Sequence, residues 1–461
     1  MRYILVFLVL VIYVFLFKKA AGTLKPNIMN VITFVFFSIL GFNLVGGSLV
    51  YLGFREHYLI QRITQDNTID KTYYILAYTV LMLPLVIILA NKYIFKIDKT
   101  KENGETLKSK YIDKLNEKVD IGNKVEINRM FIFIVILTLI CLISICYVFK
   151  CIGYIPFLQY FGSELDLNVE RIKVSRNFNG NEYIKNLIML SITPIISYIA
   201  YIYMSITKEK RWKILFIVLL ILNLLALTYN FEKSPIIYYL LFFYIIKVIL
   251  GKNFEFKKII PIVCIFIIII FLLYRIVIGY TGPLISLKHG PVSRIILTQV
   301  ATLFLHVDAF PNQIEYLEGH SFPKILVPFL GEGDYDIRSG RLVVELYNTY
   351  TVRKGIAGVM NTLFVGEAYA NFGIIGVVIA PFIAGIIFSA ILAWFIKSKK
   401  TIINIAIYIQ AFASFIGVLQ GGFVEFFYNI KFIEIILLMC LIKFIINPQK
   451  YIGKIWINKA R

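Results

Sequence analysis

The sequence predicts an all-helical protein that crosses a membrane many times. Hydrophobic residues make up 59% of its 461 residues, charged residues only 16%, and the mean hydropathy is +0.78. Such a composition lies outside the range of soluble globular proteins. The apolar residues also gather in runs close to the ~20 residues that a helix needs to cross a bilayer. We therefore expect one polytopic membrane domain over residues 1–461 rather than several soluble domains.

The apolar runs predict about eleven spans. The first run is expected to remain as a span, because Lys18 and Lys19 follow it and no small-residue cleavage site comes after them. The predicted spans are residues 3–17, 28–52, 72–95, 130–152, 186–206, 212–230, 236–250, 259–281, 372–396, 402–420 and 430–447.

The charge of the chain predicts its orientation. A net charge of +21 in a soluble protein would suggest nucleic acid, but here the lysines lie in short segments between apolar runs. Eleven spans place all of these segments on one side, which the positive-inside rule makes the cytoplasm. We expect the N-terminus outside, the C-terminus inside and no nucleic-acid partner. The basic segments are 18–25, 96–129, 208–213, 252–258, 397–400 and the C-terminal residues.

Three segments are predicted to lie outside: 53–71, 153–185 and 282–371. The third is by far the longest, so a function is sought there first. Within it, Arg294–Phe310 has apolar residues on most of one helical face, which predicts a helix along the membrane surface or a re-entrant helix. The inner segment 96–129 is rich in lysine and glutamate, and we expect a solvated amphipathic connector there.

The outer loops carry arginines that could bind a diphosphate. Arg171 and Arg176 flank Lys173 in the second outer segment. A guanidinium makes bidentate, charge-assisted hydrogen bonds to phosphate, and a lipid-linked diphosphate at the bilayer surface would be within reach. The alternative is a solvated loop in which these charges balance nearby acids, namely Glu164, Asp166, Glu170 and Glu182.

The third outer segment mixes carboxylates with guanidiniums, which suits a site that deprotonates a hydroxyl and stabilises a phosphate leaving group. Alternating acids also suggest calcium, but Ile337 and Val343 stand where a calcium loop needs glycine and glutamate, so no metal is expected. Five cysteines without C-x-x-C spacing predict free thiols rather than a zinc site or disulfides. The charged residues are Glu332, Asp334, Asp336, Arg338, Arg341, Glu345 and Arg353.

Some ionisable residues lie in or beside the apolar runs. Arg275 falls inside the eighth predicted span, where it either snorkels to the outer interface or faces a cavity that receives a polar headgroup. Glu367 precedes the ninth span and raises the same question. His306 is conceivable as a general base, but His306 and Asp308 stand two positions apart and do not share a helix face.

Two short stretches resemble one known family. The sequence NTLFVGEAYANFGIIGVV, Asn361–Val378, is similar to the C-terminal signature of bacterial oligosaccharide repeat-unit polymerases, the O-antigen and capsule polymerases of the Wzy type. The sequence FEKSPIIYYLL, Phe231–Leu241, resembles the tight outer turn of that family, although Lys233 stands where arginine is more usual. The resemblance implies a GT-C-like membrane glycosyltransferase in the bacterial cytoplasmic membrane.

Such polymerases transfer a growing glycan from undecaprenyl diphosphate onto a new lipid-linked repeat at the outer face, in capsule, O-antigen or exopolysaccharide synthesis. The resemblance implies no cofactor, and it implies a flippase and a chain-length regulator as partners. On this basis Glu367 or Glu345 would be the catalytic base. The diphosphate-binding candidates are Arg171, Arg176, Arg275, Arg338, Arg341 and Arg353.

Other functions stay open at this point. An O-antigen-type ligase takes the same kind of donor and typically relies on a histidine of the large external loop, for which His289, His306 and His320 are available. A flippase or transporter of lipid-linked sugars would place its arginines along a path through the bilayer. A purely structural membrane protein is a further possibility.

Overall fold

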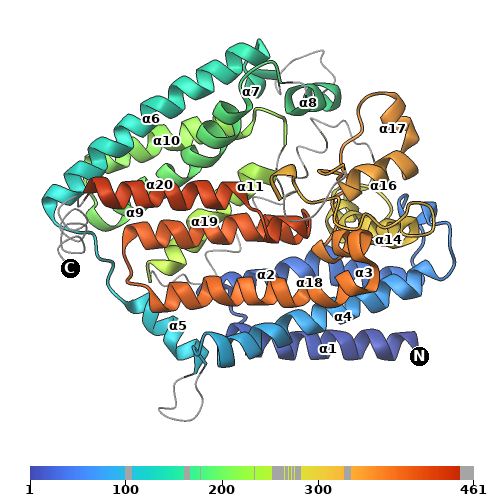
Figure 1. The fold of residues 1–461 in the computed structure, drawn as a ribbon. Helices are drawn as coiled ribbons and strands as arrows, with labels where there is room; N and C mark the ends of the chain where they lie inside the picture. Colours follow the sequence, from blue (N-terminus) through green and yellow to red (C-terminus); the bar gives the residue numbers. More distant parts are fainter. Residues whose placement is uncertain are drawn as a thin grey trace. The chain divides into compact units, whose positions relative to one another are not determined.

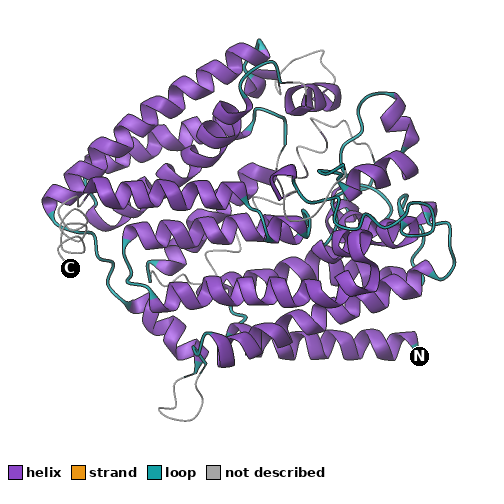
Figure 2. Cartoon of the chain, in the orientation of Figure 1, coloured by secondary structure: helices purple, strands orange, loops and turns teal. Residues whose placement is uncertain are grey.

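The computed structural model describes residues 1–98, 106–159, 167–176, 178–232, 234–251, 282–326 and 334–446, together with 264, 268, 271 and 275. In this part of the chain the secondary structure is helical and contains no strand (Figure 2). Eight of the described helices are long and apolar enough to cross a membrane. The prediction of an all-helical, polytopic membrane protein is confirmed at this level.

Seven of the eight helices coincide with predicted spans. Three more predicted spans are helices that are shorter or carry a charged first turn: α10 (Lys210–Leu227), α11 (Ser234–Ile249) and α20 (Ile430–Ile446). The predicted span 259–281 lies outside the described residues apart from four positions. The eighth helix, Pro291–Ala309, belongs to the third outer segment of the sequence analysis. Eleven crossings therefore remain a prediction.

The chain divides into two compact units. Unit 1 comprises residues 1–113, 253–396 and 415–428, and unit 2 comprises 114–252, 397–414 and 429–461. Helix α5 (Leu107–Asn116) contributes to both units, as does α19 (Ile402–Leu419). The remaining described α-helices of unit 1 are α1 (Arg2–Ala21), α2 (Val31–Ile39), α3 (Val45–Tyr51), α4 (Thr68–Leu89), α13 (Pro291–Ser293), α14 (Gln299–Ala309), α16 (Ser339–Tyr347), α17 (Thr349–Arg353) and α18 (Phe364–Lys397).

In unit 1, α1, α4 and α18 run alongside one another (Figure 1). The buried residues of α1 recur every three or four positions, as Val6, Val9, Tyr13 and Phe17 do. Its exposed residues are also apolar, and Phe7 is 65% exposed. This pattern is expected for a helix with protein on one side and lipid on the other.

A helix formed by α13, the π-helical turn η7 (Arg294–Thr298) and α14 crosses one end of unit 1. All residues from Val300 to Ala309 are buried. Before its first turn Lys288 forms an ion pair with Glu56 at 2.6 Å, and in its last turn Asp308 binds Thr64. Both ends therefore meet the same connection, residues 52–67, so this helix does not carry the chain to the other end of unit 1. The half of this helix from Val300 to Ala309 is packed inside unit 1, and the surface and re-entrant forms both remain predictions.

Helix α18 is broken at Gly373, whose backbone is left-handed with φ 58° and ψ −139°. The break leaves the carbonyls of Ala370 and Asn371 without helical partners, and they accept the N–H groups of Leu317 (2.9 Å) and Glu318 (3.0 Å). Residues 364–372 are thus a separate buried helix, and the apolar run of α18 starts close to the predicted residue 372. Glycine is favoured at this position because its φ is positive and a Cβ would lie 3.0 Å from Tyr316.

Unit 2 is built from α6 (Lys124–Ile152), the π-helix η5 (Ile184–Ile192) that continues as α9 (Thr193–Thr207), α10, α11, α20 and the first part of α19. Helix α9 packs on α10 and α11, and α6 packs on η5 and α20. The short helices α7 (Pro156–Gln159) and α8 (Leu167–Arg176) lie in the second outer segment.

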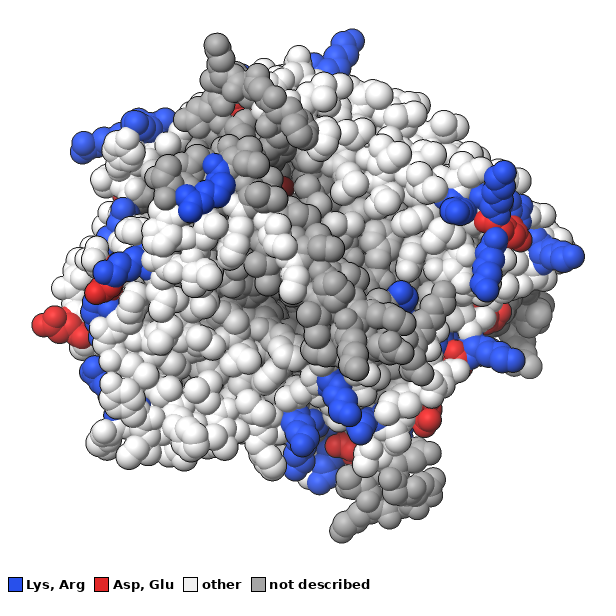
Figure 3. Space-filling view, turned by 180° about the vertical axis from the view of Figure 1, so that it is seen from behind, with Lys and Arg blue, Asp and Glu red and all other residues white. Residues whose placement is uncertain are grey.

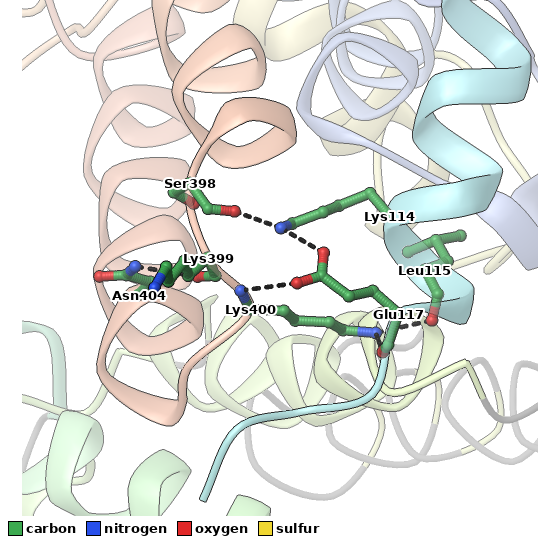
Figure 4. A network of polar contacts seen from close by, with 7 residues as sticks. All are labelled: Lys114, Leu115, Glu117, Ser398, Lys399, Lys400 and Asn404. Atoms are coloured by element: carbon green, nitrogen blue, oxygen red, sulfur yellow. Dashed lines mark hydrogen bonds and ion pairs between the residues drawn. The ribbon is translucent and has the colours of Figure 1, made fainter. Parts of the chain in front are cut away.

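Part of the inner connector is fixed to unit 2 rather than fully solvated (Figure 4). Lys114 Nζ pairs with Glu117 Oε2 at 2.6 Å, and Lys400 Nζ donates to the carbonyls of Leu115 (2.6 Å) and Glu117 (2.8 Å). Lys114 and Lys400 are 5% and 1% exposed. Burial lowers the pKa of Lys400 to about 8, although the nearby Glu117 acts in the opposite direction. The expected amphipathic character holds, because Leu107, Tyr111 and Leu115 form the buried face of α5.

A pair of glycine variants tests the close approach of the buried helix 291–309. A Cβ at Gly46 would lie 1.9 Å from the carbonyl oxygen of Ile296, whereas a Cβ at Gly41 would meet no atom within 4 Å. We expect Gly46→Ala to lower the free energy of unfolding by about 1–3 kcal/mol, as overpacking does elsewhere. Thermal unfolding of the purified protein in detergent measures the loss. Gly41→Ala is the matched control, and equal melting temperatures for the two variants would contradict this packing.

Candidate functional site

A buried carboxylate organises the end of unit 1 that carries the third outer segment. Asp308, in the last turn of α14, accepts hydrogen bonds from the N–H and hydroxyl of Thr64, the N–H of Gln65, the hydroxyl of Thr68 and the hydroxyl of Tyr347. These bonds measure 2.6–3.1 Å, and Asp308 is completely buried. A buried charge is tolerated only when such donors satisfy it. Asp308 therefore joins α4, α14 and α16.

The end of α16 is held by more than Asp308. Arg62 donates to the carbonyl of Tyr347, and Gln313 donates to the Tyr347 hydroxyl at 2.9 Å. Burial, followed by the hydrogen bond to Asp308, raises the pKa of Tyr347, so the phenol stays protonated and remains a donor. The position of α16 is thus fixed at its C-terminus, and its N-terminus, where Arg338 and Ser339 lie, is fixed with it.

His306 faces Ser339 inside the protein. Its Nδ1–H donates to the carbonyl of Thr302 at 2.7 Å, so Nε2 accepts from the Ser339 hydroxyl at 3.3 Å. Both residues are buried, His306 completely and Ser339 to 2% exposure. A sugar hydroxyl could reach His306 only if α16 moved away. The geometry therefore gives His306 a packing role between α14 and α16.

Glu367 holds a turn of unit 1 in place. Its Oε2 accepts the N–H of Val424 at 3.0 Å, at the start of the short helix η9 (Val424–Phe426). A Cβ at Gly422 would lie 2.4 Å from the same oxygen, so the turn GGFVEF needs glycine to approach the carboxylate. The segment 317–322 links the chain before Arg338 to this helix, because Leu317 donates its N–H to Ala370 O and Ile337 donates its N–H to His320 O. Glu367 is thus an anchor of the GGFVEF turn.

A partly exposed aromatic surface lies beside the GGFVEF turn. Phe322 lies near Phe372 and Phe427, with ring centroids 6.5 and 5.5 Å apart, and the latter two are 39% and 50% exposed. His320 and Tyr335 stack edge to face at 5.2 Å. Aromatic rings of this kind offer apolar faces on which a sugar ring can pack.

Arg341 and Glu345, on the same face of α16, pair with each other. Their atoms Nε and Oε1 are 2.6 Å apart, and Arg341 also donates to the carbonyl of Ala357 at 3.3 Å. Arg338 is exposed, and no described acid forms an ion pair with it. Arg353 is an exposed residue at the end of α17, and Arg275 is an exposed helical residue. Glu332 lies outside the described residues.

In unit 2 the structure joins the two stretches that the sequence analysis singled out there. Arg171, on α8, forms an ion pair with Glu232 of the FEKSP turn at 2.6 Å. Tyr154 donates to Glu170 Oε2 at 2.7 Å, and this fixes α8 to the end of α6. Arg176 ends α8, while its side chain and the whole of Lys233 lie outside the described part.

Lys185 and the structural role of Asp308 were not predicted from the sequence. Lys185 is 2% exposed; it pairs with Glu182 at 2.7 Å and its ammonium lies 4.6 Å from the ring centre of Phe178. An acid or lysine inside an apolar run is the signal that could have marked Asp308 and Lys185. Among the described residues, no three His, Cys, Asp or Glu side chains gather in a way that could hold a metal ion.

The chain matches no protein-family model, no curated protein and no solved structure among those with which it was compared. The fold therefore defines a broad class of protein, the polytopic all-helical membrane proteins.

Removal of the Asp308 charge should loosen this end of unit 1. We expect Asp308→Asn to lower the free energy of unfolding by about 2 kcal/mol or more, because an amide accepts fewer hydrogen bonds and hydrogen bonds to charged groups contribute most. Limited proteolysis of the connection 52–67 and thermal unfolding measure the effect. The exposed acid Asp66 lies in the same connection, so Asp66→Asn is the control. Equal protease resistance of both variants would argue against the role of Asp308.

The burial of His57, in the connection 52–67, predicts how the stability of unit 1 depends on pH. Its buried ring accepts the N–H of Leu59 at Nδ1 (3.3 Å) and donates from Nε2 to the Thr298 hydroxyl (3.4 Å). Burial, with the nearby charge of His289 as a smaller cause, lowers the pKa of His57 to about 4. The unfolded chain binds this proton at about pH 6.5, so stability should fall as the pH falls from about 6.5 to about 4. Melting temperatures of His57→Gln and the unmodified protein should converge over that range, and parallel curves would contradict the prediction.

Proposed function

We propose that this protein polymerises undecaprenyl-diphosphate-linked oligosaccharide repeats at the outer face of the bacterial cytoplasmic membrane. The observation that carries the proposal is the segment 317–322, whose hydrogen bonds to residues 370–371 and to residues 336–337 bring the chain before Arg338 to the helix that carries Glu367. A guanidinium and a carboxylate next to partly exposed aromatic rings are the groups that glycan transfer from a lipid diphosphate requires.

In this reaction the hydroxyl of the acceptor sugar attacks the anomeric carbon of the donor glycan. The bond between that carbon and the diphosphate oxygen breaks, and undecaprenyl diphosphate leaves with the bonding electron pair. A base takes the hydroxyl proton, and cations stabilise the negative charge on the leaving group. The donor is already activated, so the reaction needs no cofactor. A flippase that delivers the repeats and a chain-length regulator would be its partners.

Arg338 is the first choice for the diphosphate because it is exposed and lies on a fixed helix. Arg341 and Arg171 would have to exchange Glu345 and Glu232 for phosphate. Such exposed pairs contribute only about 0–1 kcal/mol, so a diphosphate can displace them. Arg176, Arg275 and Arg353 remain further candidates.

Glu367 is the preferred base and Glu345 the second choice. Glu345 already pairs with Arg341, whereas Glu367 accepts a backbone N–H, that of Val424. One variant separates the two roles of Glu367. Glu367→Gln keeps an oxygen that accepts the Val424 N–H, but it cannot take a proton.

The ligase and flippase alternatives predict different products. A ligase would deliver glycan to an acceptor other than a lipid-linked repeat, and the burial of His306 gives no support for a histidine at its centre. A flippase would move lipid-linked sugar without elongating it. Purified protein in liposomes with one type of lipid-linked repeat distinguishes all three, because only a polymerase lengthens the glycan without another acceptor or an energy source.

The same assay tests Arg338. We expect Arg338→Ala to reduce elongation by about 100-fold or more, the effect of removing one group that stabilises transition-state charge. Arg338→Lys should restore part of the activity, because an ammonium keeps the charge but loses the bidentate geometry. The exposed Lys324 of the same segment provides the control Lys324→Ala. Full activity of Arg338→Ala, in protein with unchanged melting temperature, would contradict the assignment.

Glu367→Gln completes the test. If Glu367 is the base, this variant should fold with an unchanged melting temperature and lose elongation by about 100-fold or more. If it elongates normally, Glu367 acts only as the anchor of the Gly422–Val424 turn, and the base must be sought at Glu345.

A further inference from the structure

Six exposed lysines gather at the end of unit 1 opposite Asp308. They come from the last turn of α1, the loop that follows it, residues 92–96 after α4 and the start of α5, and we call them the lysine patch. Figure 3 shows Lys and Arg side chains in separate groups, and Asp and Glu side chains lie among those at the bottom of the view. The lysine patch consists of Lys18, Lys19, Lys25, Lys92, Lys96 and Lys108.

Buried hydrogen bonds hold these chain segments together. Asn91 donates to the carbonyl of Ala20 at 3.2 Å, and Asn30 donates to the carbonyl of Ala21 at 2.9 Å. Tyr111 of α5 donates to the carbonyl of Met29 at 2.8 Å. The three donor side chains are at most 1% exposed. The lysines therefore project from one fixed platform, although they come from three parts of the sequence.

The patch borders an exposed apolar surface. Phe15, in the turn of α1 before Lys18, is 65% exposed, and Leu89, Tyr93 and Ile94 around Lys92 are 52%, 62% and 57% exposed. Apolar side chains this exposed are stable in hydrocarbon and unfavourable in water. Exposed lysines and exposed apolar side chains thus lie next to each other, an arrangement expected at the depth of lipid headgroups.

The charge at this end is mainly positive. The segments 18–30, 89–98 and 106–113 contain the six lysines and Lys110, while their acidic residues are Asp98 and Asp113. The positive-inside rule accounts for the side of the membrane on which lysines lie, but not for a fixed platform that presents them together. Basic residues next to an apolar membrane surface attract anionic lipids.

We propose that the lysine patch is a binding surface for the headgroups of anionic phospholipids. The lysine ammonium groups bind the phosphate oxygens, while the acyl chains cover Phe15, Leu89 and Ile94. Acidic proteins would match the charge but not the adjoining apolar surface. The proposal is independent of the proposed function, because it concerns a different end of unit 1 and no reaction.

The test uses the purified full-length protein in detergent with equal amounts of phosphatidylglycerol and phosphatidylcholine. Native mass spectrometry gives the ratio of the two bound lipids. We expect the unmodified protein to prefer phosphatidylglycerol. In the variant with Lys18, Lys19, Lys25 and Lys92 changed to Gln, the ratio of bound phosphatidylglycerol to phosphatidylcholine should fall about fivefold for each lysine that contacts a headgroup. In liposomes, raising the salt from 0.1 to 1 M shortens the screening length to about 3 Å and should reduce the same preference.

A second variant supplies the matched control. Lys173, Lys288, Lys324 and Lys354 are exposed and lie elsewhere, and their change to Gln removes the same charge. This control should keep the preference for phosphatidylglycerol. An equal loss in both variants, or no preference in the unmodified protein, would overturn the proposal. If the patch variant does not fold, Lys92→Gln and Lys288→Gln are compared singly, and an unchanged lipid ratio for both would overturn it as well.

Discussion

The satisfaction of one buried carboxylate, Asp308, is the constraint on which this end of unit 1, where α4, α14 and α16 meet, depends. An ionised group inside an apolar helix is stable only when donors surround it. The donors come from the connection 52–67 and from α16, far away in sequence. If the connection 52–67 or α16 moved away, the Asp308 charge would be left unpaired in an apolar environment. These two segments and α14 therefore assemble together. The position of Arg338 at the start of α16 follows from this assembly.

A second constraint is close backbone approach, and it gives the stretch NTLFVGEAYANFGIIG a physical meaning. A Cβ at Gly376 would lie 2.0 Å from the carbonyl oxygen of Ala368, and Gly373 has positive φ. Asn371 donates to Ser321 and to the carbonyl of Glu367. These residues shape a helix break that accepts the segment 317–322. These residues therefore shape the local fold, and Glu367 in the same stretch anchors the Gly422–Val424 turn.

The sequence predicted the parts of the structure that depend on local composition. Spans are marked by hydropathy alone. The Arg341–Glu345 ion pair was not predicted, although i, i+4 spacing on a helix allows it. The Asp308 hydrogen bonds join residues about 240 positions apart, and no pattern in one sequence marks such partners. The same holds for Arg171 and Glu232. The break at Gly373 was missed because an apolar run continues through it, and hydropathy does not report backbone conformation.

The arginines of the candidate site differ in what a ligand must displace. Arg171 and Arg341 each have a carboxylate 2.6 Å away, and an arriving diphosphate has to exchange with it. Arg338 is exposed and forms no ion pair with a described acid, so a diphosphate bound there would displace no carboxylate. The Glu367 carboxylate is bound by the Val424 N–H, and this hydrogen bond does not depend on Arg338. In the proposed reaction, a donor on Arg338 would therefore leave this anchor and the ion pairs of the other two arginines in place.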